Sequence, residues 1–346
     1  MEEDFPRLPA GCSIWLEAKA RDVVLRNIRD ALKVGRAGMA RELAGLGDMS
    51  LAAFLQRTPY DIDDIYGSGS GWTALRRAAG IAVVAGPDQE RLGRAIGRMR
   101  HIEDAARVDF YLALLKADQP PQMFDIAEHE KRLLTMLHFD LWATTKEFPD
   151  LAASLARLWQ HPDLRDELAQ LLEILGNRSE RADYDPEMDS AVPLRVHQRY
   201  TRLEVLAALG VGSPAQPPAI REGVYYVQGV ADLLFVTLQK DPARFKPTTR
   251  YHDYALSSHL FHWESQSTTS DSSPTGQRYI RHREMGTRVL LFVRESTHGL
   301  AGESIPFLFL GSAEHREHSG SRPMAITWQL RYAMPPDFLL EARAVA

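Results

Sequence analysis

The chain has 346 residues, of which 45% are hydrophobic and 25% charged, and its net charge is −5 at pH 7. This length and composition allow a substantial core and predict two domains. The single cysteine, Cys12, excludes an internal disulfide framework and a multi-cysteine zinc site. No apolar run approaches the roughly 18 residues that a membrane span needs, and no secretory leader opens the sequence. We therefore expect a soluble, cytoplasmic protein without a membrane partner.

The first half of the sequence predicts one amphipathic helix after another. Between Ala18 and Leu32, apolar residues recur at four-residue spacing with Arg and Asp between them. Asp48 resembles the cap of a short helix that stops near Thr58 and Pro59. A Gly–Asn pair after Leu175 is a good helix stop. The remaining helices are expected over residues 72–79, 88–99, 103–115, 129–142, 163–175 and 199–209.

A glycine-rich stretch, GSGSG at residues 67–71, superficially suggests a phosphate-binding loop. Such a loop requires Lys and then Ser or Thr after its last glycine, whereas Trp72 and Thr73 stand there. A flexible turn is the better interpretation.

The sequence pattern changes from helical periodicity to short strand-like runs after the proline-rich segment that ends near Ile220. Short runs rich in β-branched and aromatic residues then alternate with turn residues, as in an all-β barrel or sandwich. These runs cover residues 224–230, 233–240, 259–265, 277–283, 288–295, 306–311 and 324–330. The sequence thus predicts an α+β chain: a helical domain at 1–177, a linker at 178–198 and a β-barrel domain at 199–346.

Aromatic side chains gather around a polar stretch in this second half. They are Tyr251, Tyr254, Phe261, Trp263, Tyr279 and Trp328, and the neighbouring segment SQSTT supplies short hydrogen-bonding side chains. Stacking rings with nearby donors and positive charge suit a nucleic-acid base better than a lipid or a protein. Strand alternation also sends Phe261 and Trp263 to one face and His262 and Glu264 to the other, so a core role for the first pair stays open.

Charge is distributed unevenly along the chain. From Ile220 onward there are 14 Lys and Arg against 13 Asp and Glu, together with 7 of the 12 histidines. An anionic partner should therefore prefer the C-terminal part, although this balance is too small for tight non-specific DNA binding. Base contacts or further domains would have to supply much of the affinity.

Signals for catalysis or a metal are weak. His252, His259 and His262, and the pair His315 and His318, lie in a β-rich region without a supporting cysteine. No nucleophile-elbow or ATPase motif is present, and nothing in the sequence holds Asp253 and Glu264 together as acid and base. We predict no catalytic residue, no metal and no cofactor.

Several quoted segments resemble a known family. The segments are YHDYALSSHLFHWESQSTTSDSSPTGQRYIRH, VLLFVRE, PFLFLG and PMAITWQL, with looser similarity upstream in HQRYTRLEVLAALG, LPAGCSIWLEAKARDVVLRNIRDAL and IYGSGSGWTALRRAAG. They are similar to the C-terminal region of the SauUSI-type modification-dependent (type IV) restriction helicases, which act on DNA carrying methylated or hydroxymethylated cytosine. The nuclease and helicase motifs of that family are absent here, so cleavage and translocation do not transfer.

The resemblance implies a reader of modified duplex DNA that works with helicase and nuclease domains or subunits. We expect a base-flipping barrel of the SRA or PUA-like kind, or else a restriction-type DNA-binding pseudobarrel. Stacking and edge hydrogen bonds can sense a 5-methyl or 5-hydroxymethyl group on a base taken out of the stack. The candidate base-contacting residues are Tyr251, Asp253, Tyr254, Phe261, His262, Trp263, Glu264, Ser265, Gln266, Ser267, Thr268 and Tyr279. The candidate phosphate-contacting residues are Arg278, Arg281, Arg283 and Arg294.

Two other functions remain open. The acidic helical half favours a scaffold that docks a helicase or nuclease subunit. A nuclease using a His/Asp/Glu cluster around Asp253 and His262 is the other possibility.

Overall fold

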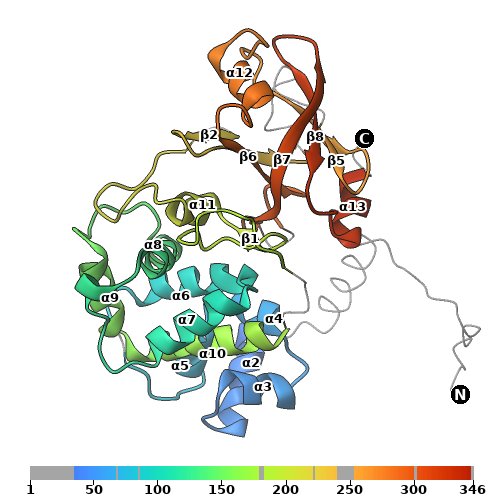
Figure 1. Cartoon of the computed structure of the whole chain (residues 1–346). Coiled ribbons are helices and arrows are strands. Elements are labelled where there is room, and N and C mark those ends of the chain that lie inside the picture. The colour runs from blue at the N-terminus through green and yellow to red at the C-terminus, as the bar shows by residue number, and fades with distance from the viewer. Residues whose placement is uncertain are drawn as a thin grey trace, which may run out of the picture.

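The computed structural model describes residues 35–67, 69–84, 86–178, 183–220, 223–239, 253–299 and 302–343. Helices fill the N-terminal part and a mixed sheet fills the C-terminal part, so the α+β class is confirmed. Figure 1 shows the helices gathered below and the curved sheet above, with a short helix and strand between them. None of the described helices is long and apolar enough to cross a membrane.

The helical part consists of nine helices among the described residues. They are α2 (Arg36–Leu46), α3 (Leu51–Arg57), α4 (Ile62–Tyr66), α5 (Trp72–Ala78), α6 (Gln89–Arg98), α7 (Ala105–Leu115), α8 (Glu128–Trp142), α9 (Leu151–Trp159) and α10 (Pro162–Arg178). Five predicted helices agree with α5, α6, α7, α8 and α10 within three residues at each end. Helix α3 begins later than expected, because Ser50 rather than Asp48 caps it. The helix predicted between Ala18 and Leu32 lies outside the described residues.

The backbone amides that follow the glycine-rich stretch bind a side chain of the protein itself. The buried carboxylate of Glu167 accepts hydrogen bonds from the backbone amides of Trp72 and Thr73, each at 2.8 Å, at the start of α5. A Cβ atom at Gly71 would lie 2.0 Å from Glu167 Oε1, so the glycine makes room for this carboxylate. An internal side chain therefore takes the place where a phosphate loop would hold its anion.

The sheet has eight strands in the order β2-β3-β6-β7-β8-β5-β4, and β1 pairs with β7 outside this order. The strands are β1 (Arg199–Tyr200), β2 (Val224–Val227), β3 (Ala231–Thr237), β4 (Tyr254–Ala255), β5 (Leu260–Glu264), β6 (Arg288–Arg294), β7 (Phe307–Ser319) and β8 (Ala325–Leu330). Three helices accompany them: α11 (Arg202–Ala208), α12 (Pro274–Arg281) and α13 (Pro336–Arg343). β3 and β6 run parallel, and the other pairs are antiparallel.

The central strands are buried on both faces. Leu233 and Phe235 of β3 belong to one hydrophobic core, which continues into the helical part, whereas Leu234 and Val236 belong to a second core. β6 divides its side chains in the same way. This explains why both strands read as continuous apolar runs in the sequence rather than as alternating ones.

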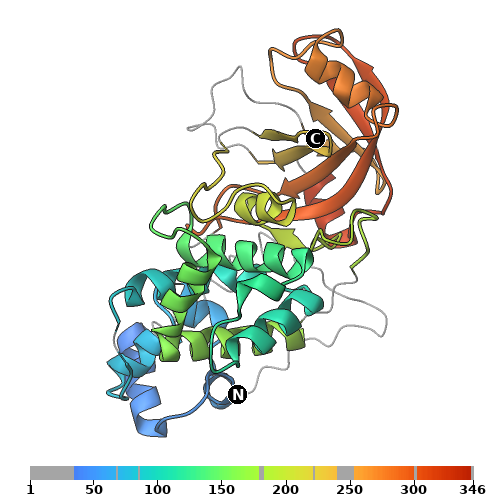
Figure 2. The ribbon, with the colours of Figure 1, turned by 60° about the vertical axis from the view of Figure 1, so that its left-hand side comes forward.

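The sheet curves around the second core without closing into a barrel, which corrects the predicted architecture. β2 and β4 stand at the two ends of the strand order. β7 links the two halves, because its first residues pair with β6 and its last ones with β8. Gly311 of β7, with a φ of 89°, lies where the register shifts against β6. Figure 2 shows the curved sheet with α12 at its far end.

The predicted strand at 277–283 is wrong, because residues 274–281 form helix α12. Ser273 caps this helix by accepting a hydrogen bond from the amide of Gly276, and Pro274 stands at its start. Ser-Pro at these positions is a helix-start signal. Tyr279 on the inner face of α12 is fully buried against Trp263 and Trp328.

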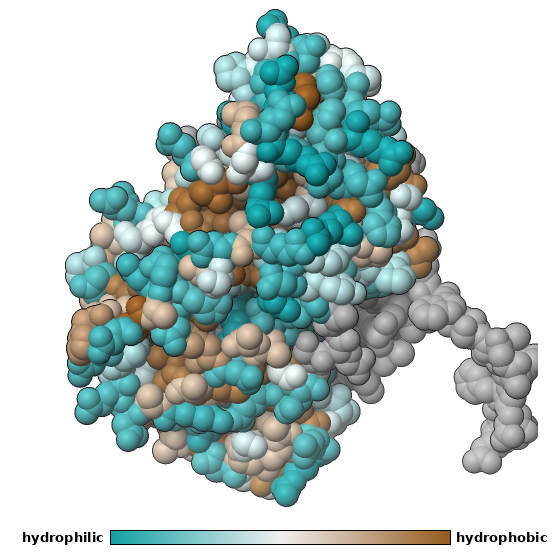
Figure 3. Space-filling model, viewed as in Figure 1, coloured by the Kyte–Doolittle hydropathy of each residue, from teal (hydrophilic) through white to brown (hydrophobic). Residues whose placement is uncertain are grey.

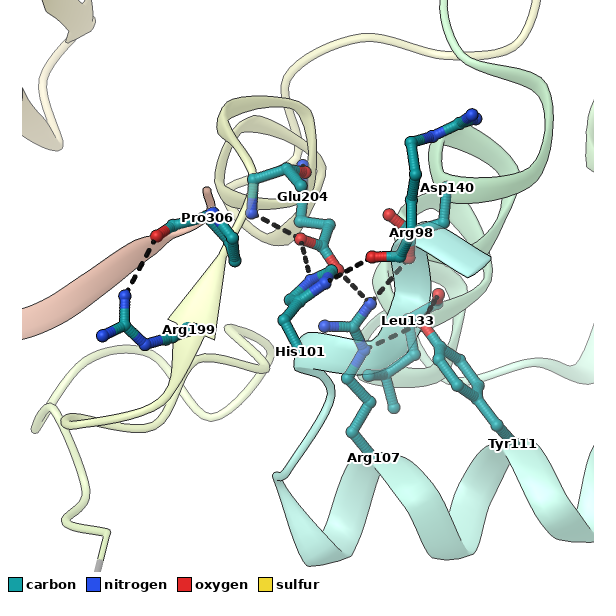
Figure 4. A network of polar contacts seen from close by, with 10 residues as sticks. Arg98, His101, Arg107, Tyr111, Leu133, Asp140, Arg199, Glu204 and Pro306 are labelled. Carbon is teal, nitrogen blue, oxygen red and sulfur yellow. Dashed lines mark hydrogen bonds and ion pairs between the residues drawn. The ribbon is translucent and has the colours of Figure 1, made fainter. Parts of the chain in front are cut away.

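The two parts meet at a buried network of charges (Figure 4). Glu204 of α11 accepts hydrogen bonds from Arg107 of α7 and from the amide of Thr201, and its carboxylate lies 2.9 Å from His101 Nε2. Arg107 also donates to Asp140 of α8 at 2.8 Å. Burial alone would raise the pKa of Glu204, but the charges of Arg107 and His101 lower it well below its usual range. Burial and the Glu204 carboxylate raise the pKa of Asp140 well above its usual range.

The segment predicted as a linker is packed over residues 183–198. Leu194 and Val196 are buried in the core that both parts share. The amide of His197 donates to the carbonyl of Phe309 on β7 at 2.7 Å. Below we call residues 35–178 the helical part and residues 199–343 the sheet part.

Candidate nucleic-acid interface

Most of the predicted aromatic side chains lie in the interior of the sheet part. Phe261, Tyr279 and Trp328 are fully buried, and Trp263 is 5% exposed. Trp263 packs edge-on against Tyr279, with ring centroids 5.5 Å apart. Phe261 and Trp263 thus take the core role that strand alternation leaves open, and with Tyr279 and Trp328 they build the second core. Tyr251 lies outside the described residues.

Tyr254 and His262 are the aromatic pair on the opposite face of the sheet. They are directly paired across β4 and β5, and their rings lie 4.8 Å apart at 30°. Both side chains are half-buried, as is Glu264 two residues further along the same face. We call Tyr254, His262 and Glu264 the outer row. Asp253 is buried beneath it and accepts a hydrogen bond from the amide of Glu264 at 3.1 Å.

The polar residues after β5 form a tight turn. Ser265 is fully buried, and its hydroxyl accepts a hydrogen bond from the amide of Met324 at 2.9 Å. The Gln266 side-chain oxygen accepts from Thr269 and from the hydroxyl of Tyr279. Ser265 and Gln266 thus hold the turn in place, which differs from the ligand-contacting role that the sequence predicts. Ser267 and Thr268 are exposed.

This turn meets the β7–β8 hairpin at one end of the sheet part. The amide of Arg322, in the β7–β8 hairpin, donates to the carbonyl of Thr269 at 3.1 Å. Arg283, after α12, forms an ion pair with Glu314 of β7 at 3.1 Å. We call residues 265–273, 281–288 and 319–323 together the tip surface. It lies at the top of Figure 1, and Figure 3 shows this end to be mainly hydrophilic.

The four predicted phosphate-contacting arginines have different surroundings. The side chains of Arg281 and Arg283 are 60% and 73% exposed on the tip surface. Arg278 instead forms a two-bond ion pair with the fully buried Asp232, at 3.1 and 2.9 Å, and its guanidinium carbon lies 3.9 Å from the Tyr226 ring centroid. Arg294 is buried at the opposite end of β6. Arg294 is therefore buried and the Arg278 side chain is only 17% exposed, so neither is an open surface cation like Arg281 and Arg283.

The tip surface includes basic residues that the sequence analysis missed. Arg288 and Arg322 are exposed there, and Arg316 is exposed on the adjoining part of β7. The signal was available for Arg322, since Gly320, Ser321 and Pro323 around it mark a hairpin end. Acidic residues are interspersed, including Asp271 and Glu284. The surface is thus mixed in charge, with arginines prominent.

Histidines also gather near this end. His315 Nε2 lies 2.9 Å from His318 Nδ1 on β7, and burial together with His318 lowers the pKa of His315. Within the described residues, no group of three or more His, Cys, Asp or Glu side chains is arranged to hold a metal ion.

Comparison with known families identifies one match. Residues 194–341 match a family model described as a domain of unknown function (DUF3427). The match covers the sheet part and the last residues of the preceding segment, and its description names no activity. No curated protein matches this chain.

Proposed function

We propose that the sheet part is a non-catalytic DNA-recognition module that binds duplex DNA carrying 5-methyl- or 5-hydroxymethylcytosine and targets a helicase–nuclease restriction system to it. The observation that carries this proposal is the tip surface, which contains exposed arginines and the exposed hydroxyls of Ser267 and Thr268. The modified base and the restriction partners rest on the sequence resemblance.

The arginines suit the duplex backbone. Arg281 and Arg283 are more than half exposed, and their ion-pair partners Glu284 and Glu314 are exposed too. Exposed ion pairs contribute little, at most about 1 kcal/mol, so a phosphate can displace these carboxylates at small cost. Contacts of this kind position a protein on DNA without reading its sequence.

Base recognition needs a second kind of contact, and the outer row provides suitable groups. The half-buried Tyr254 ring can stack on a base, and the carboxylate of Glu264 can accept from the amino group of cytosine N4. Glu264 ends β5, and the turn with Ser267 and Thr268 follows directly. Backbone and base contacts would therefore come from adjacent segments.

The test measures binding of the full chain to duplexes that differ only in one cytosine: plain, 5-methyl or 5-hydroxymethyl. We expect tighter binding to a modified duplex. The double variant Arg281→Ala/Arg283→Ala should weaken binding to every duplex and reduce the slope of log K against log salt by about 2, because two phosphate contacts are lost.

The matched control is Arg57→Ala/Arg77→Ala, which removes two exposed arginines of the helical part. It should leave affinity and salt slope nearly unchanged. If both double variants lost the same affinity, the loss would come from the change in net charge and not from contacts at the tip surface. If the chain bound the three duplexes equally, the modified-base assignment would be refuted.

A second candidate function is protein docking by the helical part. An apolar groove of about 300 Å³ lies between α7 and α8, lined by Phe110, Leu114, Ile126 and Leu134 among others. Phe124, in the connection that borders the groove, is 78% exposed. Exposed aromatic side chains beside apolar grooves are typical of interaction sites. This surface is separate from the tip surface, so docking and DNA recognition are compatible.

A further inference from the structure

Two arginines share one aromatic ring at the end of the sheet opposite the tip surface. The guanidinium carbon of Arg294, the last residue of β6, lies 4.3 Å from the Phe307 ring centroid. That of Arg202, the first residue of α11, lies 5.3 Å from the same centroid and 5.5 Å from that of Phe235. Two like charges are thus held close together on an apolar base.

Neither arginine has a carboxylate partner among the described residues. Arg294 donates from Nε to the Thr237 hydroxyl at 2.9 Å and from Nη1 to the carbonyl of Ile305 at 3.0 Å, both uncharged acceptors. Arg202 makes no hydrogen bond in the described structure, and its Nε atom is buried. The nearby Glu295 is already engaged by Arg199, which lies within 3.3 Å of both its carboxylate oxygens.

The electrostatic consequence is unfavourable for both cations. Burial lowers the pKa of Arg202. Burial and the charge of Arg202 lower the pKa of Arg294 to about 10, against a smaller opposing effect of Glu295. Buried charges are ordinarily paired with an opposite charge, and among the described residues these two mutually repelling cations have no ion-pair partner.

The two arginines lie at the carboxyl ends of a parallel strand pair. Thr237 and Arg294 are directly paired and are the last residues of β3 and β6, the two parallel strands. In open sheets, ligands commonly bind beyond the carboxyl ends of parallel strands. α11 brings Arg202 to the same place, since Arg202 and Arg294 lie over the same Phe307 ring.

We propose that Arg202 and Arg294 form an anion site that binds a phosphate group, supplied either by a nucleotide or by a nucleic-acid backbone. Guanidinium groups are planar forks that match phosphate oxygens, and two of them balance a phosphate dianion. The site lies beside α11, whose Glu204 joins the sheet part to the helical part (Figure 4). It is separate from the tip surface and does not depend on the function proposed for it.

The test titrates the full chain with inorganic phosphate by calorimetry, at constant ionic strength set with chloride. We expect saturable binding that Arg202→Gln weakens at least about tenfold, as the loss of charge-assisted hydrogen bonds implies. Arg202→Lys keeps the charge but loses the fork and should bind with intermediate affinity. Arg165→Gln is the control for the loss of an arginine that lies over a ring: Arg165 lies over Trp159 and, unlike Arg202, also donates to a backbone carbonyl.

Melting in phosphate-free buffer provides the second readout. Arg202→Gln removes a repulsion there and should melt no lower than the parent chain. Absence of saturable phosphate binding, or equal binding by Arg202→Gln, would overturn the proposal. A third result would also overturn the proposal: Arg202→Gln melts at a lower temperature than the parent chain, and phosphate does not change the melting temperature of the parent chain. Arg202 would then stabilise the fold through its ring contacts alone.

Two competitors identify the source of the phosphate. Displacement of phosphate by ATP alone assigns a nucleotide, and displacement by a short unmodified duplex assigns a nucleic-acid backbone. If neither ATP nor the duplex displaced bound phosphate, the assignment to a nucleotide or a nucleic-acid backbone would be overturned. Arg281→Ala/Arg283→Ala, which tests the tip surface, should bind phosphate like the parent chain, so the two proposals can fail independently.

Discussion

At the scale of single residues, burial separates side chains that the sequence places side by side. In β5 the exposure alternates, so Phe261 and Trp263 enter the second core while His262 and Glu264 face outward. Neighbouring positions therefore have different roles. Core aromatics hold the sheet and α12 together, whereas the outer row is half-buried on the other face.

Paired substitutions at Tyr254 and Trp263 test this division. Tyr254→Ala should weaken DNA binding by about 1–3 kcal/mol, the usual contribution of a ring stacked on a base. Its thermal melting should change little, because the Tyr254 ring is only half-buried and contacts His262 at the surface. Binding is measured with the modified duplex, and melting without DNA.

Trp263→Ala should instead cost about 3–5 kcal/mol of folding stability, because a large buried ring leaves a cavity beside Tyr279 and Trp328. Its binding, measured well below its melting temperature, should change less than that of Tyr254→Ala. The reverse pattern, normal melting with poor binding in Trp263→Ala, would place Trp263 in a ligand pocket and contradict the structure.

Sequence alternation predicts which β5 residues share a face, because that pattern depends only on the backbone of one strand. It could not predict that Arg278 pairs with Asp232, since 46 residues separate them and only the folded chain brings them together. The sequence therefore identifies candidate phosphate contacts by residue type alone. Of the four candidate arginines, Arg281 and Arg283 lie exposed on a common surface.

At the scale of elements, segments with clear local signals are predicted well. The helices α5 to α8 and α10 have apolar residues at helical spacing, and β3 and β6 are apolar runs. Two elements were misjudged for different reasons. For α12 the sequence predicts a strand because Tyr279 and Ile280 favour strands, although Ser273 and Pro274 begin a helix. β7 extends to Ser319 through the polar sequence EHREHS, because pairing with β8 holds it extended.

The network between α7, α8 and α11 makes stability depend on pH. Burial and Glu204 raise the pKa of Asp140, so the folded protein keeps a proton at Asp140 that the unfolded chain releases above about pH 4. Folding then takes up a proton, and this contribution to stability falls as pH rises from about 4 towards the raised pKa. Asp140→Asn carries no titrating group and should lack this decline.

Urea unfolding at several pH values between 4 and 8 measures this effect. The free energy of unfolding of Asp140→Asn should fall less with pH than that of the parent chain, and near pH 7 the variant should be at least as stable. Asp109→Asn is the matched control, because Asp109 is an exposed aspartate on α7. Identical pH profiles for the parent and Asp140→Asn would show that Asp140 is ionised in the folded protein.

At the scale of the whole molecule, one hydrophobic core crosses from the helices into the sheet. It contains Leu137 and Leu172 of the helical part as well as Phe235, Phe292 and Phe309 of the sheet part. Composition predicted two domains but not this shared core, because apolar content does not show which faces meet. Two domains joined by a free linker would melt separately, whereas parts that share a core should unfold together.

Glu204→Gln tests this coupling. The substitution removes the charge that Arg107 and His101 share and leaves Arg107 buried with less compensation. Breaking a buried ion pair in this way costs about 3–5 kcal/mol of stability. Because the network lies where the two parts meet, we expect calorimetry to show a single transition for the parent chain and a single transition at lower temperature for the variant.

The control is Glu187→Gln, because Glu187 forms an exposed ion pair with Arg331. This variant should hardly shift the melting temperature. If the parent chain showed two transitions and Glu204→Gln moved only one of them, the helical and sheet parts would be independent folding units.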